Sequence, residues 1–315
     1  MTYQCERSNN ESASDCIVDQ RDNQPKINNS GTVHHKFAHA GIFEPKGSNL
    51  VISRIIPSET ECVAGSLGSE TVEQALRSLR LNGALIIENI VDAAIIAGAR
   101  RAFGEGYSHF LNGSDPKNVL MVGARRLLIT IKLEPPFDNP RLFANPYLLP
   151  IIGAELGDGF VLGAFGIVCS LPSAPAQNRH HDGGVLFSSG IDYLLPATAI
   201  TVGIPLLEMN EVHGTTALWP GSHRDGGRLK EESINPIVRE GSCMLWDFRL
   251  WHAGTPNRSA LPRPLLYLTY CRPWFLEPNF DKWINPKQRP LLATKNFLSS
   301  LSEQHQRLLV RAQDV

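Results

Sequence analysis

Apolar residues recur at helical spacing in two stretches near the start of the chain. The first stretch contains Val72, Leu76 and Leu79, and the second runs from Ile95 to Phe103. Between them, residues 84–90 form a short apolar run, which favours a strand. This pattern predicts an N-terminal layer made of a helix, a strand and a helix.

Polar residues at the ends of these stretches predict where the two helices begin and end. Thr71 and Gln74 have the spacing of a capping box, so the first helix is expected to start at Thr71. Asn82 and Gly83 are typical of a left-handed helix end. Asp92 is expected to cap the second helix.

The second half of the chain has a different pattern. Short runs rich in Val, Ile, Leu, Phe and Tyr are separated by Gly, Pro and Asn, with no long helical pattern between them. Such punctuation indicates a sandwich or barrel. The predicted strands are residues 159–171, 199–207, 242–247 and 265–270. An amphipathic polar stretch, residues 295–311, predicts one surface helix near the C-terminus.

The two ends of this pattern suggest the domain organisation. Residues 1–46 are rich in Asn, Ser, Asp and Gln and show no periodicity, which predicts a disordered polar tail. Residues 47–315 are then expected to form a single domain, with its β core at about 159–275.

Composition and charge narrow the possible partners and compartment. The 30 basic and 31 acidic side chains nearly cancel, so no basic field is available for nucleic acid. The six cysteines form no CxxC pair, which argues against a zinc knuckle or a disulfide framework and favours a reduced compartment. The polar N-terminus resembles no signal peptide, and no apolar run is long enough to span a membrane. We therefore expect a cytoplasmic protein.

The strongest local signal for chemistry is His180-His181-Asp182. Side chains two apart on a strand point to the same face, so His180 and Asp182 can converge on one metal while His181 points away. An imidazole and a carboxylate suit a first-row divalent ion. Alone, an H-x-D pair is weak, because a hydrogen-bonded histidine near a strand end gives the same pattern.

Two later residues strengthen the metal hypothesis. His252 follows a strand-like run and would complete a facial triad of two histidines and one carboxylate. Arg263 comes eleven residues after His252, at the start of the last predicted strand. Its planar fork of donors matches a carboxylate, as required to hold a 2-oxo diacid next to the metal. A surface salt bridge is the ordinary alternative for such an arginine.

With these residues the sequence resembles the phytanoyl-CoA dioxygenase family of Fe(II)- and 2-oxoglutarate-dependent oxygenases. Four segments carry the resemblance: the pair His180 and Asp182, residues 210–223, residues 247–257, and Arg263 with the strand that follows it. The likeness extends from about residue 70 to about residue 280. It implies a double-stranded β-helix (a jelly roll, cupin-like) with supporting helices at both ends. It also implies that His180, Asp182 and His252 are the catalytic iron ligands.

The resemblance implies further contacts with 2-oxoglutarate. Gln177, Lys132 and Thr255 stand where relatives place residues close to this cosubstrate, and Arg263 would hold its distal carboxylate. Some relatives have a serine two residues after the second histidine, where this chain has Gly254. Ordinary hydrogen bonding within the fold is an equal alternative for Gln177, Lys132 and Thr255. His223 is given a structural role, and the tryptophans, Trp246 included, are expected to be core or pocket wall rather than catalytic.

The implied reaction uses Fe(II), 2-oxoglutarate and O2 to oxidise an unactivated C–H bond of a small molecule, with release of succinate and CO2. The near-neutral charge favours a natural-product intermediate, since no basic cluster is present for the phosphates of coenzyme A. An acyl-CoA hydroxylase of the same family remains an alternative. So do a non-catalytic partner subunit and a cupin-type metalloenzyme that needs no 2-oxoglutarate. A homodimer is possible.

Overall fold

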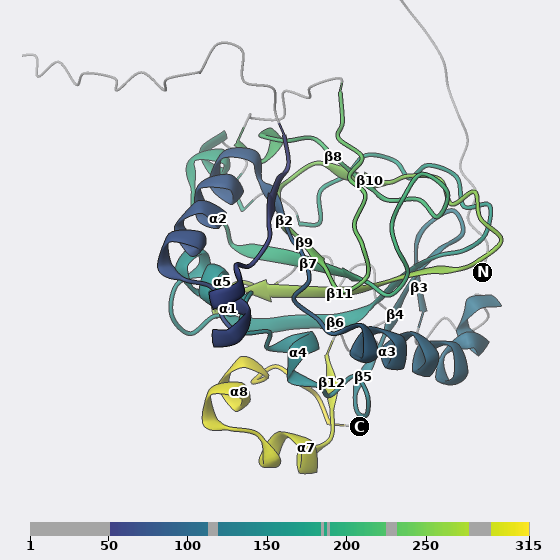
Figure 1. Cartoon of the computed structure of the whole chain (residues 1–315). Helices are drawn as coiled ribbons and strands as arrows, with labels where there is room; N and C mark the ends of the chain where they lie inside the picture. The colour runs from purple at the N-terminus through teal and green to yellow at the C-terminus, as the bar shows by residue number, and fades with distance from the viewer. Residues whose placement is uncertain are drawn as a thin grey trace, which may run out of the picture. The chain divides into compact units, whose positions relative to one another are not determined.

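The computed structural model describes residues 51–112, 119–183, 186–187, 190–224, 232–276 and 291–314 (Figure 1). The predicted tail, residues 1–46, lies outside the described residues. All of the described residues belong to a single compact unit. No helix in the described segments combines the length and the apolar character that a bilayer crossing requires.

The main sheet has eight strands in the order β1-β2-β9-β7-β11-β6-β4-β3. Only β1 and β2 pair in parallel, and every other neighbouring pair is antiparallel. The strands are β1 (Ser53–Ile55), β2 (Ala84–Ile87), β3 (Val119–Gly123), β4 (Arg126–Thr130), β6 (Val161–Ser170), β7 (Ala199–Pro205), β9 (Cys243–Asp247) and β11 (Arg263–Cys271). This sheet confirms the predicted β-rich fold class.

Two small sheets complete the strand structure. One pairs β8 (Thr216–Leu218) with β10 (His252–Gly254), and an isolated antiparallel bridge joins His180 to His252 beside it. The other pairs β5 (Lys132–Leu133) with β12 (Leu292–Ala293). In Figure 1 these two sheets lie on opposite sides of the main sheet, with β8 and β10 at the top and β5 and β12 at the bottom.

Helices flank the main sheet, and they come from the N-terminal, middle and C-terminal parts of the domain. They are α1 (Glu59–Ala64), α2 (Ser69–Asn82), α3 (Ala93–Gly106), α4 (Pro140–Phe143), α5 (Leu149–Leu156), α7 (Lys295–Ser300) and α8 (Glu303–Leu308), with 3-10 turns η1 (Ser108–Asn112), η2 (Gly190–Leu194) and η3 (Ser222–Arg224). The predicted periodic residues Leu76, Leu79, Ile96 and Phe103 are buried in the largest core cluster.

The start of α2 differs from its prediction. The helix is capped by Gly68 and begins at Ser69, so Thr71 lies inside its first turn. The Thr71 hydroxyl instead bonds to the carboxylate of Glu61, and this bond is the main reason that the pKa of Glu61 falls to about 2. The predicted capping box at Thr71 is therefore wrong, because a tertiary partner takes the hydroxyl. The predicted end is confirmed, since Gly83 adopts a left-handed φ of 77°.

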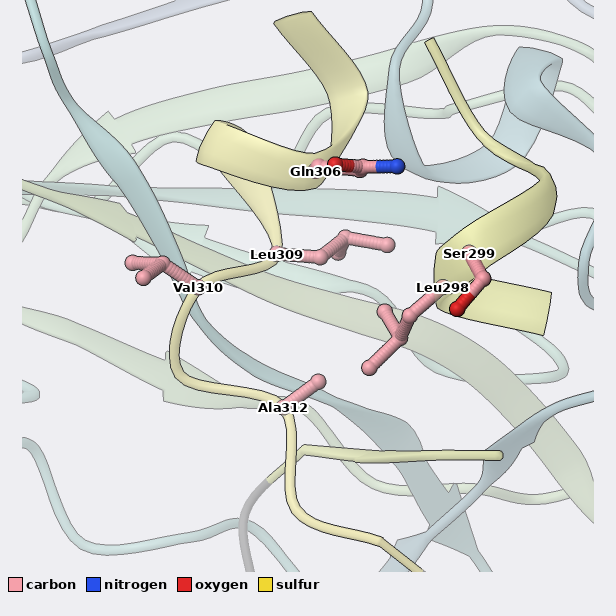
Figure 2. Close-up of a pocket in the computed structure, with 6 residues that line it drawn as sticks. All are labelled: Leu298, Ser299, Gln306, Leu309, Val310 and Ala312. Atoms are coloured by element: carbon pink, nitrogen blue, oxygen red, sulfur yellow. The ribbon is translucent and has the colours of Figure 1, made fainter. Parts of the chain in front are cut away.

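The C-terminal stretch also differs from its prediction. Instead of one helix, α7 and α8 are separated at Leu301, whose φ of −81° and ψ of 156° are extended. Ser302 then caps α8 by accepting a hydrogen bond from His305 N. Helical periodicity alone could not locate this break. The hollow between the two helices, about 210 Å³, is lined by Leu298, Ser299, Gln306, Leu309, Val310 and Ala312 (Figure 2).

The register of the main sheet fixes which side chains share its inner face. Arg126 of β4 and Arg263 of β11 both pair with Ser170 of β6, so all three project to the same side. Thr201 of β7 pairs with Trp246 of β9 in the same way. The opposite face holds the apolar core, which includes Leu127, Ile167 and Leu266.

Candidate metal centre

His180, Asp182 and His252 are brought together next to the inner face of the sheet. Their ligand atoms all lie within 4.8 Å of one another, close enough to hold one metal ion. The His180–His252 bridge sets this proximity, because each residue donates its backbone N–H to the carbonyl of the other, at 2.9 and 2.8 Å. Asp182 is fixed close by, with its N–H bonded to Phe248 O. The three residues that the sequence analysis proposed as metal ligands thus lie close together in the structure.

Both imidazoles are oriented by a hydrogen bond from Nδ1 to the backbone carbonyl two residues earlier. Nδ1 of His180 lies 2.9 Å from Asn178 O, and Nδ1 of His252 lies 2.9 Å from Leu250 O. A protonated Nδ1 that donates to a carbonyl leaves Nε2 with its lone pair, which is the form that binds metals. Nε2 of His252 lies 3.4 Å from Asp182 Oδ1. Each histidine therefore turns Nε2 toward the shared centre.

The charges of Asp182 and His180 suit a divalent cation. Burial alone would raise the pKa of Asp182, but His252, His180 and Thr201 together hold it well below its usual range. Burial and the neighbouring His252 lower the pKa of His180. An ionised carboxylate and a neutral imidazole are the protonation states that a metal requires.

His181 points away from the metal group, as the alternation predicts. Its ring stands edge-on to Trp251, with centroids 4.9 Å apart. Arg179, on the same outer side, lies over Trp219 at 5.2 Å and Trp251 at 6.0 Å. His181 and Arg179 therefore anchor the outer side of this segment, while His180 and Asp182 lie on its inner side.

Arg263 is buried and lies beside a second buried arginine, Arg126, which sequence analysis missed. The two side chains are 2% and 1% exposed, and neither forms an ion pair with a described residue. Burial, together with the Arg126 charge, lowers the pKa of Arg263 to about 10. Two like charges buried side by side are costly unless an anion joins them.

Unpartnered atoms show where such an anion fits. Within the described segments, Arg263 Nε and Nη1, Arg126 Nε and Ser170 Oγ are buried with no hydrogen-bond partner. These donors stand on adjacent strands of one sheet face. Buried donors normally have acceptors, so the cluster is suited to a carboxylate supplied from outside the chain. This observation supports the fit of a 2-oxo diacid next to the metal group.

Arg126 also connects the two segments that carry the metal group. Nη1 donates to Pro175 O at 2.5 Å, and Nη2 donates to Thr255 O at 2.6 Å and Gly254 O at 3.3 Å. Pro175 precedes the first histidine, and Gly254 follows the second. Arg126 thus fixes the spacing of the two segments while its Nε remains available.

The other three predicted cosubstrate residues are placed differently. The Gln177 amide donates to Val122 O at 2.6 Å and accepts from Gly254 N at 3.0 Å, so it connects parts of the fold next to Arg126. The Thr255 hydroxyl accepts from Thr215 N at 2.7 Å. Both contacts agree with the alternative of ordinary fold hydrogen bonding, and a role with the cosubstrate stays a prediction.

Lys132 lies in β5, which pairs with β12, and its backbone N–H donates to the Tyr107 hydroxyl at 3.3 Å. A role with the cosubstrate stays a prediction for this residue too.

Gly254 is required by its contact with Arg126. A Cβ at this position would stand 2.7 Å from Arg126 Nε. We expect Gly254→Ala to destabilise the protein by about 1–3 kcal/mol, as overpacked cores do, because three carbonyl bonds prevent Arg126 from moving aside. Thermal unfolding measures the effect. The matched control is Gly104→Ala in α3, where a Cβ meets nothing within 4 Å. Equal melting temperatures for the two variants would contradict the proposed crowding.

Comparison with known proteins agrees with this site. A model of the phytanoyl-CoA dioxygenase family matches residues 79–265, which is more than half of the chain and contains all of the residues described above. The structure of AviO1 from Streptomyces viridochromogenes Tue57 is similar, with a TM-score of 0.52, 18% identity, and coverage of 67% of this chain and 100% of that one.

Two further solved structures are similar at lower scores. The non-haem α-ketoglutarate-dependent epimerase SnoN from nogalamycin biosynthesis has a TM-score of 0.49 and 17% identity, covering 65% of this chain and 84% of that one. The non-haem monooxygenase ThoJ, as its nickel complex, has a TM-score of 0.49 and 16% identity, covering 64% and 79%. The family match is the decisive finding, and by it this chain belongs to the phytanoyl-CoA dioxygenase family of Fe(II)- and 2-oxoglutarate-dependent oxygenases.

Proposed function

We propose that this oxygenase binds Fe(II) through Nε2 of His180, Nε2 of His252 and Oδ1 of Asp182. The observation that supports this assignment is the convergence of these atoms within 4.8 Å, with each imidazole turned by a carbonyl two residues earlier. Bound iron, with 2-oxoglutarate and O2, supplies the oxidising power that breaks a C–H bond and yields succinate and CO2 as co-products. The three side chains would hold the metal and would leave the rest of its coordination sphere to the cosubstrate and O2.

We further propose that the distal carboxylate of 2-oxoglutarate lies against Arg263, with Arg126 Nε and Ser170 Oγ beside it. The four unpartnered atoms at this position support the assignment. An arriving carboxylate would neutralise one of the two buried positive charges and accept hydrogen bonds from the buried donors. The cosubstrate is thereby oriented before the metal-bound end reacts.

The substrate class is a small organic molecule, and we favour a natural-product intermediate over an acyl-CoA. Half-buried Leu128 and Val168 share the inner face with Arg126 and Arg263, and they give this face apolar surface for a substrate. The balanced charge of the chain provides no concentrated basic cluster for the phosphates of coenzyme A. Succinate release in the presence of candidate small molecules, and of acyl-CoA thioesters as the competing class, distinguishes these substrates.

The first test is optical. Metal-free protein, kept without oxygen, receives Fe(II) and then 2-oxoglutarate, and we expect a weak visible charge-transfer band from the chelated cosubstrate. His180→Ala removes one of three ligands and is expected to lose the band. His181→Ala, whose side chain faces Trp251, is the matched control and is expected to keep it. Absence of the band in folded wild-type protein would contradict the iron and 2-oxoglutarate assignment.

A further inference from the structure

Side chains of the main sheet hold the second carboxylate oxygen of Asp182, Oδ2, and the Tyr267 hydroxyl also bonds to this carboxylate. Thr201 Oγ1 donates to it at 2.7 Å, and Trp246 Nε1 donates to it at 2.8 Å. The two donors come from β7 and β9 and stand directly opposite each other in the strand register. They therefore approach Oδ2 from one side, while Oδ1 lies 3.4 Å from His252 Nε2.

Both donors are fixed in place by burial. Thr201 is 0% exposed and Trp246 is 1% exposed. The Trp246 ring also packs against His252, with centroids 5.4 Å apart, and against Tyr267 at 6.3 Å. An indole N–H donates but cannot accept or bind a metal, so Trp246 can act on the centre only through Asp182 and these packing contacts.

We propose that Thr201 and Trp246 are positioning residues that keep Asp182 a ligand through one oxygen. The inference rests on the proposed function, and it concerns which atom of Asp182 faces the metal. Two hydrogen bonds to Oδ2 occupy the lone pairs that a metal would need, and they fix the rotation of the carboxylate so that Oδ1 faces His252.

The consequence concerns the open face of the metal. A metal held by these three residues would have to keep room for the 2-oxo acid and O2. A carboxylate that bound the metal through both oxygens would take up part of that room. Holding Oδ2 on the sheet would therefore leave Oδ1 as the single ligand atom of Asp182.

The alternative is that the two bonds only satisfy buried donors of the sheet. In that case, loss of the Thr201 hydroxyl would lower the stability of the protein but would not change its affinity for the metal. Thr201→Val and Thr201→Ser separate the two roles, because valine keeps the shape and loses the donor while serine keeps the donor. Trp246→Phe removes the second donor independently.

The experiment measures anaerobic Fe(II) binding to wild type and to the three variants, with melting temperatures of the metal-free proteins recorded alongside. We expect Thr201→Val and Trp246→Phe to weaken Fe(II) affinity about ten- to a hundredfold, the usual effect of losing a partner of a metal ligand. Thr201→Ser is expected to bind Fe(II) close to wild type. The Co(II) absorption spectrum, which responds to coordination number, should change in a Thr201→Val, Trp246→Phe double variant and not in Thr201→Ser.

Folded Thr201→Val and Trp246→Phe proteins with wild-type Fe(II) affinity and unchanged Co(II) spectra would overturn the inference. Equal weakening in Thr201→Ser and Thr201→Val would also overturn it, since the hydroxyl would then be irrelevant. If Trp246→Phe does not fold, the comparison of Thr201→Val with Thr201→Ser is sufficient to test the inference. A wild-type protein that binds no Fe(II) would instead contradict the proposed function, so the two failures are distinguishable.

Discussion

Replacement of Arg263 with alanine is expected to raise the 2-oxoglutarate concentration required for half-maximal succinate release by about a hundredfold or more. Loss of one partner from a buried, hydrogen-bonded charge pair costs on the order of 2–5 kcal/mol, and each 1.4 kcal/mol is tenfold in affinity. Arg263 is 2% exposed, and its Nε and Nη1 have no partner in the described part of the protein. Initial rates at varied 2-oxoglutarate and saturating Fe(II) measure the change.

The Arg263→Ala variant should fold, which makes its kinetics interpretable. The side chain forms no ion pair with a described residue and stands beside the like charge of Arg126, so its removal relieves repulsion. Arg263→Lys keeps the charge without the planar fork and is expected to be intermediate. Arg258→Ala is the matched control, because the guanidinium of this exposed arginine donates to Glu211 O, at 3.3 Å, rather than lying on the sheet face.

An unchanged requirement for 2-oxoglutarate in Arg263→Ala would remove this arginine from the cosubstrate site. If activity then also persisted without 2-oxoglutarate, the cupin-type metalloenzyme would become the better description. If 2-oxoglutarate were still required, Arg126 would be the remaining candidate for its carboxylate. Metal binding in each variant, measured beforehand, separates both outcomes from loss of iron.

The metal group could be predicted from the sequence because its chemistry is local. His180 and Asp182 are two residues apart, and His252 and Arg263 follow in an order that resembles a known family. The spacing of two residues needed only the geometry of an extended strand. The structure brings His180, Asp182 and His252 within ligand distance of one another. It also gives the strand order, which the pattern could not specify.

Arg126 could not be predicted in the same way. Its partners, Pro175 and Gly254, are 49 and 128 residues away in sequence, and its burial depends on the pairing of β4 with β6. The resemblance pointed instead to Lys132, at the other end of the same apolar run. A basic residue at the beginning of an apolar strand was the available signal, but only the strand register shows that Arg126 and Arg263 both lie opposite Ser170.

Trp246 illustrates a second limit. Its burial was expected, and at 1% exposure it is indeed core. Its indole N–H also donates to Asp182, a contact that depends on the register between β7 and β9 and on the position of the segment after His180. Sequence pattern predicts which residues are buried far better than which atoms their polar ends contact.

Arg249→Met is expected to destabilise the protein by about 3–5 kcal/mol, because it leaves a buried carboxylate without its partner. Arg249 and Asp247 are 9% and 4% exposed. The guanidinium donates to Asp247 Oδ1 at 2.9 Å and to Oδ2 at 2.8 Å. Thermal or urea unfolding measures the loss, which corresponds to a melting temperature lower by on the order of 10 °C in a domain of this size.

The same guanidinium also holds the segment that follows the metal ligand Asp182. Nη1 donates to Asp192 O at 2.7 Å, inside η2, and to Leu195 O at 2.8 Å, just after η2 ends. Methionine preserves much of the apolar stem but cannot replace these bonds, so a compensating Asp247→Leu change should restore only part of the stability.

Arg100→Met is the matched control: its ion pair with Glu240 is 44% and 36% exposed, and exposed pairs contribute less than about 1 kcal/mol. Equal unfolding midpoints for Arg249→Met and Arg100→Met would show that the buried pair does not stabilise this part of the fold.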